Sequence, residues 1–474
     1  AWRSLVREFV QQIHFVGIGG VGMSGIASVL LDQGYRVTGS DLVVGSLTRR
    51  LAERGAVIDV GHDARHIVGA DVVVASTAVS TENVEVTAAR NAGIPVIPRA
   101  EMLGELMRFR RGIAVAGTHG KTTTTSLIAS ILATAGLDPT FLVGGLVNSV
   151  RGYAQLGTGQ WLIAEADESD ASFLCLQPYL AVVTNIDADH LENFSGDFEK
   201  LVDVFVEFLQ RLPFYGLAIL CLDDPVVRRL RARLNKPVIT YGTVVDAQYR
   251  ATDISQDGPR MTFNAHLPGG HILAVDLALA GEHNVLNALA AIAIADKVGV
   301  SHQPIRDGLA GFEGIGRRFE ILGEVAVQGG SAVLVDDYAH HPREIQATLE
   351  AARGCWPDRR RVVVFQPHRY TRTRDLFDQF ADLLAAEACL IVAEVYPAGE
   401  VPLDGADGRS LCQAIRSRGG RDPVFMDDVR DLAVRLDEVV QPGDVVLTLG
   451  AGDIGRVVRE SLTFNRSVPE DAQG

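Results

Sequence analysis

The stretch Ile113-Ala114-Val115-Ala116-Gly117-Thr118-His119-Gly120-Lys121-Thr122-Thr123 decides the fold of this chain, because a short apolar run leads directly into a glycine-rich turn. Apolar residues at helical spacing follow between 127 and 135, and Gly136 stands where a helix is expected to end. The pattern predicts a strand, a turn and a helix in that order. Such a turn directs several backbone N–H groups and the positive end of the helix dipole at one point, which suits a phosphate.

The side chains that follow the second glycine of this turn favour nucleotide binding. Lys121 can reach terminal phosphates, and the hydroxyl of Thr122 can hold Mg²⁺. The full eight-residue phosphate-binding pattern has a glycine where this chain has Val115, so the loop is a shortened variant. The alternative is a plain strand-to-helix turn, which leaves Gly-Lys-Thr-Thr as a coincidence. We therefore predict that residues 117–123 bind ATP or GTP.

Length, composition and charge limit the classes of protein to consider. The 474 residues suffice for about three domains, and a hydrophobic content of 47% supplies a core for each. The net charge of −15 disfavours nucleic acid and anionic membranes as partners, but it allows a small phosphorylated substrate. The five cysteines never form Cys-x-x-Cys, which predicts no zinc site. No signal peptide or membrane-spanning run is evident, so we expect a cytoplasmic protein. We also expect a monomer or weak homodimer.

Strand-like apolar runs alternate with helical stretches along almost the whole chain, which is typical of an α/β protein. One unit begins near residue 13, a second at the phosphate-binding turn and a third near residue 314. Between 249 and 271 the pattern loosens into polar, alternating segments. We expect antiparallel strands or an insertion there.

A second glycine motif, Gly17-x-Gly19-x-x-Gly22, lies near the N-terminus. It follows the apolar run 13–16 and precedes a helical pattern, and Asp41 follows the next strand-like run, 36–40. This is the dinucleotide fingerprint, in which the helix N-terminus binds a diphosphate and the acidic residue binds a ribose hydroxyl. A UDP-sugar offers the same two groups, so the motif fits either NAD or UDP. A tight turn without a ligand is the third possibility.

Acidic clusters follow two further strand-like runs. The run 161–164 precedes Glu165-Ala166-Asp167-Glu168-Ser169-Asp170, and the run 179–184 precedes Asn185-Ile186-Asp187-Ala188-Asp189-His190. Ligands of open α/β sheets bind beyond the carboxyl ends of the strands, so both clusters should share the edge that carries Lys121. Acidic oxygens beside a triphosphate require Mg²⁺, and we predict Glu165 as its ligand with Thr122, and His190 at a second metal site. A solvated loop face is the alternative, and it suits Asp167 and Asp187 best.

A third group of polar residues follows the strand-like run 333–335. Asp336 and Asp337 end this run, His340 and His341 follow, and Pro342 stands at a plausible first helical position. Adjacent histidines point in different directions, so they are poor candidates to chelate one metal and better candidates for substrate contact. The run 362–365 leads to a segment with three arginines, which suit carboxylate or phosphate binding. We interpret the late glycine motif at 450–455 as a tight turn, because too little chain follows it for a binding unit.

Together these motifs resemble the Mur ligases of peptidoglycan synthesis. The resemblance extends from about residue 13 to 455 and rests on their order: Gly-Ile-Gly-Gly, Gly-Thr-His-Gly-Lys-Thr-Thr, Glu-Ala-Asp-Glu-Ser-Asp, Thr-Asn-Ile-x-x-Asp-His, His-Asn-x-x-Asn, Gly-Arg-Arg-Phe and Asp-Tyr-Ala-His-His-Pro. It implies an N-terminal Rossmann-like domain for a UDP-sugar (1–109), a central ATPase domain with a mostly parallel sheet (110–316) and a C-terminal Rossmann-like domain (317–474). Within the family, the resemblance is greatest to the ligase that adds the first amino acid. That implies ATP-dependent joining of L-alanine to the lactyl carboxylate of UDP-N-acetylmuramate.

The resemblance also implies roles for individual residues. The residues expected near the UDP-sugar are Gly17, Gly19, Gly20, Ser40, Asp41, His62 and Arg99, with Glu168, Ser169 and Ser172 facing the muramoyl group. Those expected to hold phosphate and two Mg²⁺ ions are Lys121, Thr122, Glu165 and His190, and the adenine pocket matches His283, Asn284 and Asn287. Those expected in the C-terminal domain are Asp337 for the ATP ribose, Arg318 for a phosphate, and Tyr338, His340 and Arg372 for the amino acid. We regard His340 as a candidate base for the attacking amine.

Three other functions remain open at this stage. An NAD-dependent oxidoreductase accounts for residues 17–41 alone and leaves Gly120-Lys121-Thr122 and Glu165 unexplained. A sensor of UDP-sugar or ATP predicts binding without phosphate release. A sister ligase with another amino acid or a peptide as acceptor is hardest to separate, since one methyl group changes binding by only about 1–3 kcal/mol.

Overall fold

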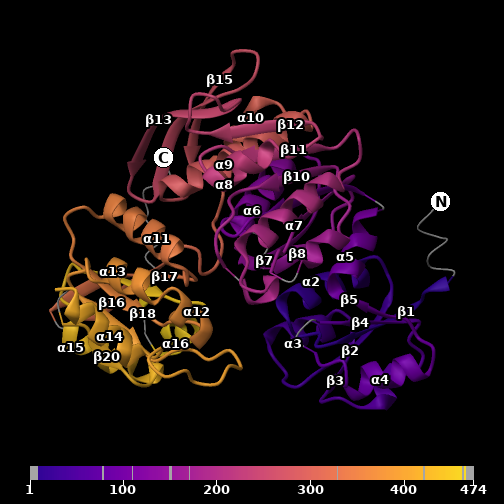
Figure 1. Cartoon of the computed structure of the whole chain (residues 1–474), viewed down its shortest axis with the longest axis horizontal. Coiled ribbons are helices and arrows are strands. Elements are labelled where there is room, and N and C mark those ends of the chain that lie inside the picture. The colour runs from indigo at the N-terminus through magenta and orange to yellow at the C-terminus, as the bar shows by residue number, and fades with distance from the viewer. Residues whose placement is uncertain are drawn as a thin grey trace. The chain divides into compact units, whose positions relative to one another are not determined.

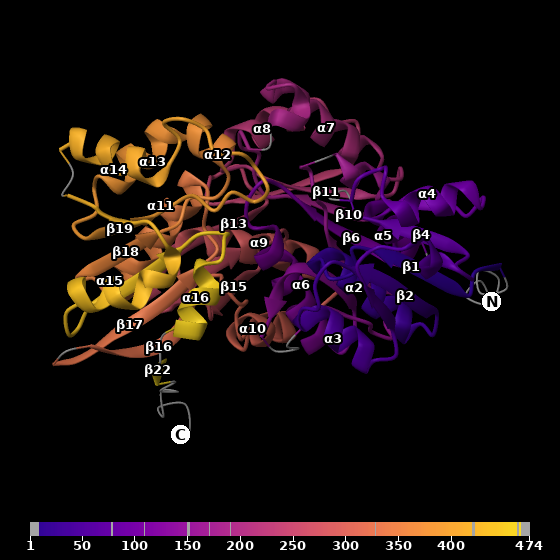
Figure 2. The ribbon, with the colours of Figure 1, turned by 90° about the horizontal axis from the view of Figure 1, so that it is seen from below.

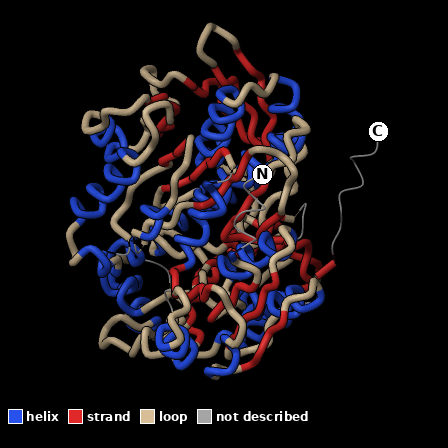
Figure 3. Tube along the Cα trace, turned by 90° about the vertical axis from the view of Figure 1, so that its right-hand side faces the viewer, coloured by secondary structure: helices blue, strands red, loops and turns tan. Residues whose placement is uncertain are grey.

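The computed structural model describes residues 9–76, 79–108, 110–148, 152–169, 171–189, 191–327, 329–419, 422–461 and 464–465. Helices and strands alternate along these ranges (Figure 3), as the sequence pattern predicts. The chain divides into two compact units. The first contains 1–254, 263–277 and 284–313, and the second contains 255–262, 278–283 and 314–474.

The first sheet has five parallel strands in the order β3-β2-β1-β4-β5. Its strands are β1 (Gln12–Val16), β2 (Arg36–Asp41), β3 (Val57–Val60), β4 (Val72–Ala75) and β5 (Val96–Pro98). Its helices are α2 (Val21–Asp32), α3 (Ser46–Glu53), η1 (Ala64–Ile67), α4 (Val84–Asn91) and α5 (Arg99–Arg108). The strand order reverses direction between β1 and β4, which is the position where open α/β sheets bind ligands.

The two faces of this sheet differ in polarity. Helices α2 and α3 lie on one face and α4 on the other (Figure 2). Alternation along β1 directs Ile13 and Phe15 into the α2 core, while Val16 joins the smaller core beneath α4. The α4 face also carries buried polar side chains, His14 and Ser40 among them.

The central sheet has ten strands in the order β15-β14-β13-β12-β11-β10-β6-β9-β7-β8. Its strands are β6 (Arg111–Ala116), β7 (Thr140–Val147), β8 (Gly152–Gln155), β9 (Trp161–Glu165), β10 (Leu180–Val183), β11 (Leu217–Cys221), β12 (Val238–Gly242), β13 (Tyr249–Asp257), β14 (Arg260–His266) and β15 (Ile272–Leu277). Strands β7, β9, β6, β10, β11, β12 and β13 pair in parallel, and β8 is antiparallel to β7. The looser segment 249–271 forms strands as expected, but β13 pairs in parallel with β12 before the chain turns back at Gly258.

Helices cover both faces of the central sheet. They are α6 (Lys121–Thr134), α7 (Phe198–Gln210), α8 (Pro225–Arg231), α9 (Glu282–Lys297) and α10 (His302–Ala310). Figures 1 and 2 show α7 and α8 on one face and α6 and α10 on the other. Helix α6 ends within one residue of its predicted end, and Gly136 has a φ of +72° just beyond it, as a helix terminus favours.

The second unit contains a seven-stranded sheet in the order β20-β19-β18-β21-β17-β16-β22. Its strands are β16 (Glu320–Val327), β17 (Gly330–Asp337), β18 (Arg361–Phe365), β19 (Leu390–Ala393), β20 (Val424–Met426), β21 (Val445–Leu449) and β22 (Phe464–Asn465). Its helices are α11 (Pro342–Cys355), α12 (Tyr370–Asp375), α13 (Phe377–Leu384), α14 (Gly408–Ser417), η4 (Val429–Asp431), α15 (Leu432–Val439) and α16 (Ile454–Ser461). One core packs against α11, α13 and α14 and a second against α15 and α16. Among the described residues, no helix is long and apolar enough to cross a membrane.

Candidate active site

The turn predicted to bind phosphate connects β6 to α6 and requires glycine at both ends. Gly117 has a φ of +127° and Gly120 a φ of +81°, conformations that other residues rarely adopt. A Cβ at Gly117 would lie 2.1 Å from Oγ1 of Thr184, and one at Gly120 would lie 2.5 Å from Oδ1 of Asn287. The turn is therefore closely packed on two sides, and it presents the first N–H groups of α6, which have no partners within the helix.

Replacing Gly120 with alanine is expected to weaken ATP binding by about tenfold or more, because the new Cβ must displace Asn287 at an overpacking cost of about 1–3 kcal/mol. Gly136→Ala is the matched control: its φ is also positive, but no atom of the described part of the chain lies within 4 Å of the added Cβ. Both variants should lose stability from the backbone strain, and Gly120→Ala should lose more because of the overpacking. Equal ATP dissociation constants for the two variants, measured by calorimetry, would contradict the close packing of this turn.

Lys121 stands at the first position of α6, and its ammonium group is surrounded by acceptors. Its Nζ donates to both carboxylate oxygens of Glu168, at 3.0 and 2.9 Å, and to the carbonyl oxygen of Gly117 at 2.6 Å. Burial opposes the charge on Lys121, but the carboxylates of Glu168, Asp167 and Glu165 raise its pKa. Lys121 therefore keeps its positive charge in a fixed position beside the turn. A bound triphosphate requires a positive charge at such a position. The sequence singled out both residues but did not predict that they pair.

Oxygen donors for a metal ion come from two adjacent segments. Glu165 ends β9, which pairs with β6 so that Val115 and Glu165 are partners, and its Oε1 accepts the N–H of Gly144 at 2.8 Å. Thr122 is buried in the first turn of α6. Carboxylate and hydroxyl oxygens are hard ligands that fit Mg²⁺. The other predicted ligand, His190, lies outside the described residues.

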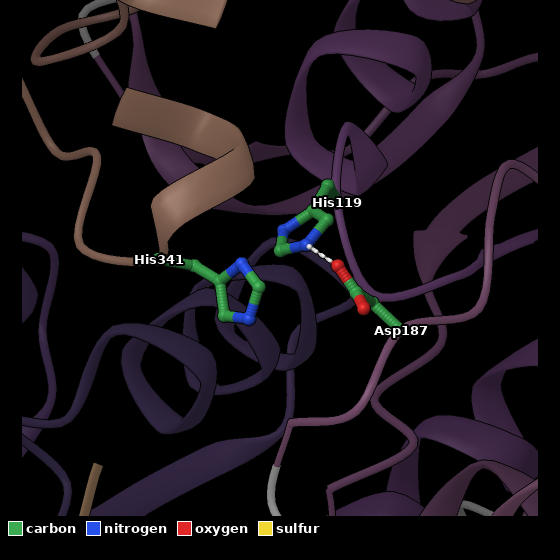
Figure 4. Close-up of side chains that lie close together, drawn as sticks. All are labelled: His119, Asp187 and His341. Carbon is green, nitrogen blue, oxygen red and sulfur yellow. Dashed lines mark hydrogen bonds and ion pairs between the residues drawn. The ribbon is translucent and has the colours of Figure 1, made fainter. Parts of the chain in front are cut away.

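The second acidic segment, which begins at Asn185, forms hydrogen bonds with the phosphate-binding turn. The side chain of Asn185 accepts the N–H of His119 at 2.8 Å and donates to its carbonyl oxygen at 3.0 Å. Nε2 of His119 lies 3.3 Å from a carboxylate oxygen of Asp187 (Figure 4), and the N–H of Asp187 donates to Oγ1 of Thr118. Asn185 was missed as a functional residue because its partner, His119, is far away in the sequence.

The residues predicted for the adenine pocket differ in their surroundings. Asn284 and Asn287 are buried on α9, where Nδ2 of Asn287 donates to Oδ1 of Asn284 at 3.0 Å. Oδ1 of Asn287 accepts from the hydroxyl of Thr124 at 3.1 Å, which joins α9 to α6. His283 is exposed and belongs to the second compact unit.

The N-terminal glycine motif forms a tight turn between β1 and α2. The N–H groups of Gly17 and Ile18 donate to the carbonyl oxygen of Ser40, and the N–H of Gly19 donates to the carboxylate of Asp41 at 2.8 Å. Gly20 is the residue that precedes α2. This geometry suits a diphosphate at the helix N-terminus and a ribose beside Asp41.

Arg99 links this turn to the acidic segment of the central sheet. Its guanidinium occupies the space that a side chain at Gly22 would fill, and its Nη2 lies 3.8 Å from a carboxylate oxygen of Asp167. Nearby, Ser169 donates its N–H to Asp167, and Ser172 begins the short helix η2 (Ser172–Cys175). The predicted sugar-nucleotide and phosphate residues of the first unit are thus connected by Arg99, Asp167, Glu168 and Lys121.

The second unit carries the remaining predicted residues. Asp337 ends β17 and accepts the N–H groups of Phe319 and Ala339, both at 2.8 Å, and the hydroxyl of Thr348 at 3.1 Å. The guanidinium groups of Arg317 and Arg318 lie over the ring of Tyr338, at 5.1 and 5.2 Å. Arg317 also lies 3.3 Å from the buried carboxylate of Asp336, and Arg318 lies 3.8 Å from that of Glu344.

Two histidines and an arginine meet at the end of β18. His340 and His368 have ring centroids 5.8 Å apart, and Nη1 of Arg372 lies 3.2 Å from Nδ1 of His368. Burial lowers the pKa of His368 to about 3, and the neighbouring side chains of His340, Arg372 and Arg369 contribute to the shift, so His368 accepts a hydrogen bond from Arg372 as a neutral ring. His368 was missed among the site residues. His341 is the N-cap residue that precedes α11, and its Nδ1 accepts the N–H of Arg343.

Asp337 gives this unit an expected pH dependence. Burial raises its pKa to about 6, although Arg318 and the N–H donors oppose the shift. Between about pH 4 and 6 the folded carboxyl keeps a proton that the unfolded chain releases, so stability should fall by up to about 3 kcal/mol as the pH rises through this range. Urea unfolding at pH 4, 5, 6 and 7 should show this slope in the wild type and not in Asp337→Asn. If the free energy of unfolding changes with pH in the same way in both proteins, the raised pKa of Asp337 is contradicted.

Comparison with known proteins identifies the family. Residues 12–111 match the Mur ligase family catalytic domain, residues 115–295 the Mur ligase middle domain, and residues 317–452 the Mur ligase glutamate ligase domain. The chain belongs to the Mur ligase family.

The relatives cover nearly the whole chain. The UDP-N-acetylmuramate–L-alanine ligase of Methylococcus capsulatus is 58% identical over 95% of this chain and 96% of its own length. The enzyme of the same name from Halorhodospira halophila is 56% identical over 94% and 92%. Among solved structures, the UDP-N-acetylmuramate–alanine ligase of Thermotoga maritima has a TM-score of 0.80 at 30% identity, covering 95% of this chain and 97% of that one. A murein peptide ligase from Psychrobacter arcticus has a TM-score of 0.70 at 26% identity, covering 95% and 98%.

Proposed function

We propose that this chain is an ATP-dependent ligase that joins L-alanine to the lactyl carboxylate of UDP-N-acetylmuramate, with ADP and phosphate as the other products. The observation that carries the proposal is the match, over nearly the full length of both chains, to ligases named for these two substrates. The held ammonium of Lys121 beside Glu168 supplies the chemistry that such a ligase needs. We place the reaction in the cytoplasm, where ATP and nucleotide sugars are available.

The reaction follows from the chemistry of carboxylates. A carboxylate does not acylate an amine at neutral pH, because its oxygen is a poor leaving group. A carboxylate oxygen therefore attacks the γ-phosphorus of ATP, ADP leaves, and an acyl phosphate forms. The amine of L-alanine attacks the acyl carbon, and the tetrahedral species expels phosphate and loses one proton to give the amide. Such a transfer depends mainly on positioning and on neutralisation of charge.

Each proposed residue contributes to this reaction. Lys121 offsets charge on the β- and γ-phosphates, and the N-terminus of α6 binds the same phosphates through backbone N–H groups. Mg²⁺, held by Thr122 and Glu165, supplies further neutralisation of phosphate charge when it is bound. A second ion at His190 remains a prediction, as does the state of monomer or weak homodimer.

The amino acid is assigned to residues of the second unit. The planar guanidinium of Arg372 can bind a carboxylate through two N–H groups. The neutral ring of His368 orients this guanidinium by accepting a hydrogen bond from it. Nδ1 of His340 is 3.0 Å from the carbonyl oxygen of Tyr338, so that nitrogen donates. Nε2 of a neutral His340 is then an acceptor, which suits the base that takes the proton of the amine.

The rival functions fit less well. An NAD-dependent oxidoreductase gives no role to Lys121 and Glu168, and the relatives named above are ligases. A sister ligase that uses another amino acid differs from an L-alanine ligase only in the pocket that surrounds the side chain of the amino-acid substrate. Phosphate release from ATP and Mg²⁺ decides among these functions when it is measured with UDP-N-acetylmuramate and each of L-alanine, glycine, L-serine and L-glutamate. We expect release that needs both the sugar nucleotide and L-alanine. Release that ignores the sugar nucleotide would overturn the proposal, and preference for another amino acid would support the sister ligase.

A further inference from the structure

A fully buried carboxylate, Glu85, binds groups from several elements of the first sheet. The hydroxyl of Ser40 at the end of β2 donates to its Oε2 at 2.5 Å, and Nδ1 of His62 lies 3.2 Å from the same oxygen. Nδ1 of His66 in η1 lies 2.6 Å from Oε1. Nε2 of His14, in β1, lies 3.7 Å from Oε2, and both side chains are completely buried.

The sequence places this cluster through strand alternation and a helix cap. His14, Thr38 and Ser40 point to the α4 face of β1 and β2, where Nδ1 of His14 bonds the hydroxyl of Thr38 at 2.8 Å. The side chain of Asn83 caps α4 by accepting the N–H of Glu85 at 2.9 Å, which fixes Glu85 in the first turn. The cluster therefore lies at the reversal of strand order between β1 and β4.

Structural need alone does not explain a buried charge here. Burial disfavours an ionised Glu85, but the nearby ring of His14 and hydrogen bonds from Ser40 and His66 outweigh it and lower its pKa to about 2. Apolar residues of similar volume commonly serve a core as well as, or better than, a buried polar network of this kind. The rest of the α4 face is packed with apolar residues, among them Val16, Val73 and Val86.

The cluster fixes the orientation of two groups at the sheet edge. A carboxylate only accepts hydrogen bonds, and the hydroxyl proton of Ser40 is directed at Glu85, so Nδ1 of His62 must carry a proton. Nε2 of a neutral His62 is then an acceptor, and the described residues provide it with no hydrogen-bond partner. The His62 side chain keeps 20% of its surface exposed, so this nitrogen is the one available to a ligand.

We propose that Glu85 is a positioning residue for the uridine end of the sugar nucleotide, acting through Ser40 and His62. This inference rests on the proposed function, which places the diphosphate at the turn after β1. Ser40 is the penultimate residue of β2, which pairs with β1, and His62 follows β3, which pairs with β2, so both stand where the nucleoside extends along the sheet edge. The acceptor on His62 complements the ring N–H of uracil, which cytosine lacks.

Calorimetric binding of UDP and of ATP to the full chain tests this role without turnover. Glu85→Gln puts an amide NH₂ among donors, and we expect UDP to bind at least about tenfold more weakly while ATP binds as in the wild type. The preference for UDP over CDP should fall as well. Asp71→Asn is the matched control, because among the described residues this carboxylate accepts only the N–H groups of Gln11 and Gln12 beside the same sheet. It should keep wild-type affinity for UDP.

A double-mutant cycle separates positioning from simple structural support. If Glu85 acts through His62, Glu85→Gln should change UDP affinity less than threefold in a His62→Ala background. A full effect in both backgrounds would overturn the proposal, and so would wild-type UDP affinity in Glu85→Gln. Glu85→Asp, with a shorter carboxylate, replaces Glu85→Gln in both measurements if the amide variant does not fold. Failure of the wild type to bind UDP would instead overturn the sugar-nucleotide site, and this inference with it.

Discussion

Replacing Lys121 with methionine is expected to lower kcat by about 10³-fold or more. The ammonium group of Lys121 lies beside the phosphate-binding turn, and its Nζ is 2.9 Å from a carboxylate oxygen of Glu168. An arginine that stabilises transition-state charge in phosphoryl transfer is worth about 10³–10⁵ in rate, and we expect Lys121 to contribute at the lower end of that range. Lys200→Met is the matched control, because Lys200 is exposed on α7, and it should keep wild-type turnover. Steady-state phosphate release measures both.

Loss of Lys121 also leaves the buried Glu168 without its partner, so Lys121→Met should lower the melting temperature as well. The double variant Lys121→Met/Glu168→Gln separates the two effects. We expect the neutral amide to restore most of the stability and none of the turnover. Recovery of turnover together with stability would show that Lys121 acts only as a structural ion pair.

Glu165→Gln is expected to lower kcat by about 10²–10³-fold at ordinary Mg²⁺ concentrations. The amide oxygen can still accept the N–H of Gly144, so the end of β9 should stay in place while the metal loses a charged ligand. Raising the Mg²⁺ concentration should recover part of the activity. The control is Glu199→Gln, an exposed glutamate paired with Arg229 at 3.2 Å.

A titration of phosphate release against Mg²⁺ checks this assignment. The apparent Mg²⁺ constant should rise by about tenfold or more in Glu165→Gln and should not change in Glu199→Gln. An unchanged Mg²⁺ constant combined with low turnover would move Glu165 from metal binding to another role. Wild-type turnover would remove it from the site.

Local patterns predicted most of the fold. The strand, turn and helix around residues 113–134 form as predicted. Strands also form at the strand-like runs 13–16, 161–164, 179–184 and 362–365, because apolar alternation and glycine placement are local signals. Pro342 begins α11 as predicted, and Glu344 completes its cap. The parallel pairing of β13 with β12 was not predictable, since register between strands depends on the tertiary context.

The site was predictable where a motif contains all its parts and not where partners are far apart in the chain. Lys121 and Glu168 were both singled out, but their pairing spans 47 positions. Glu85 lies in an ordinary helical pattern, and only the folded sheet brings it to Ser40, 45 positions away. His368 likewise became recognisable only when its ring met Arg372 and His340. No local signal marks Glu85 or His368 as part of a site.

The most direct test of the account follows the oxygen atoms of the substrate carboxylate. UDP-N-acetylmuramate labelled with ¹⁸O in both lactyl carboxylate oxygens is incubated with the enzyme, ATP, Mg²⁺ and L-alanine, and the released phosphate is analysed by mass spectrometry. The account predicts that each phosphate carries one ¹⁸O atom and that the amide product keeps the other, because the acyl phosphate breaks at its carbon–oxygen bond. Released phosphate without ¹⁸O would contradict activation of the carboxylate by phosphoryl transfer.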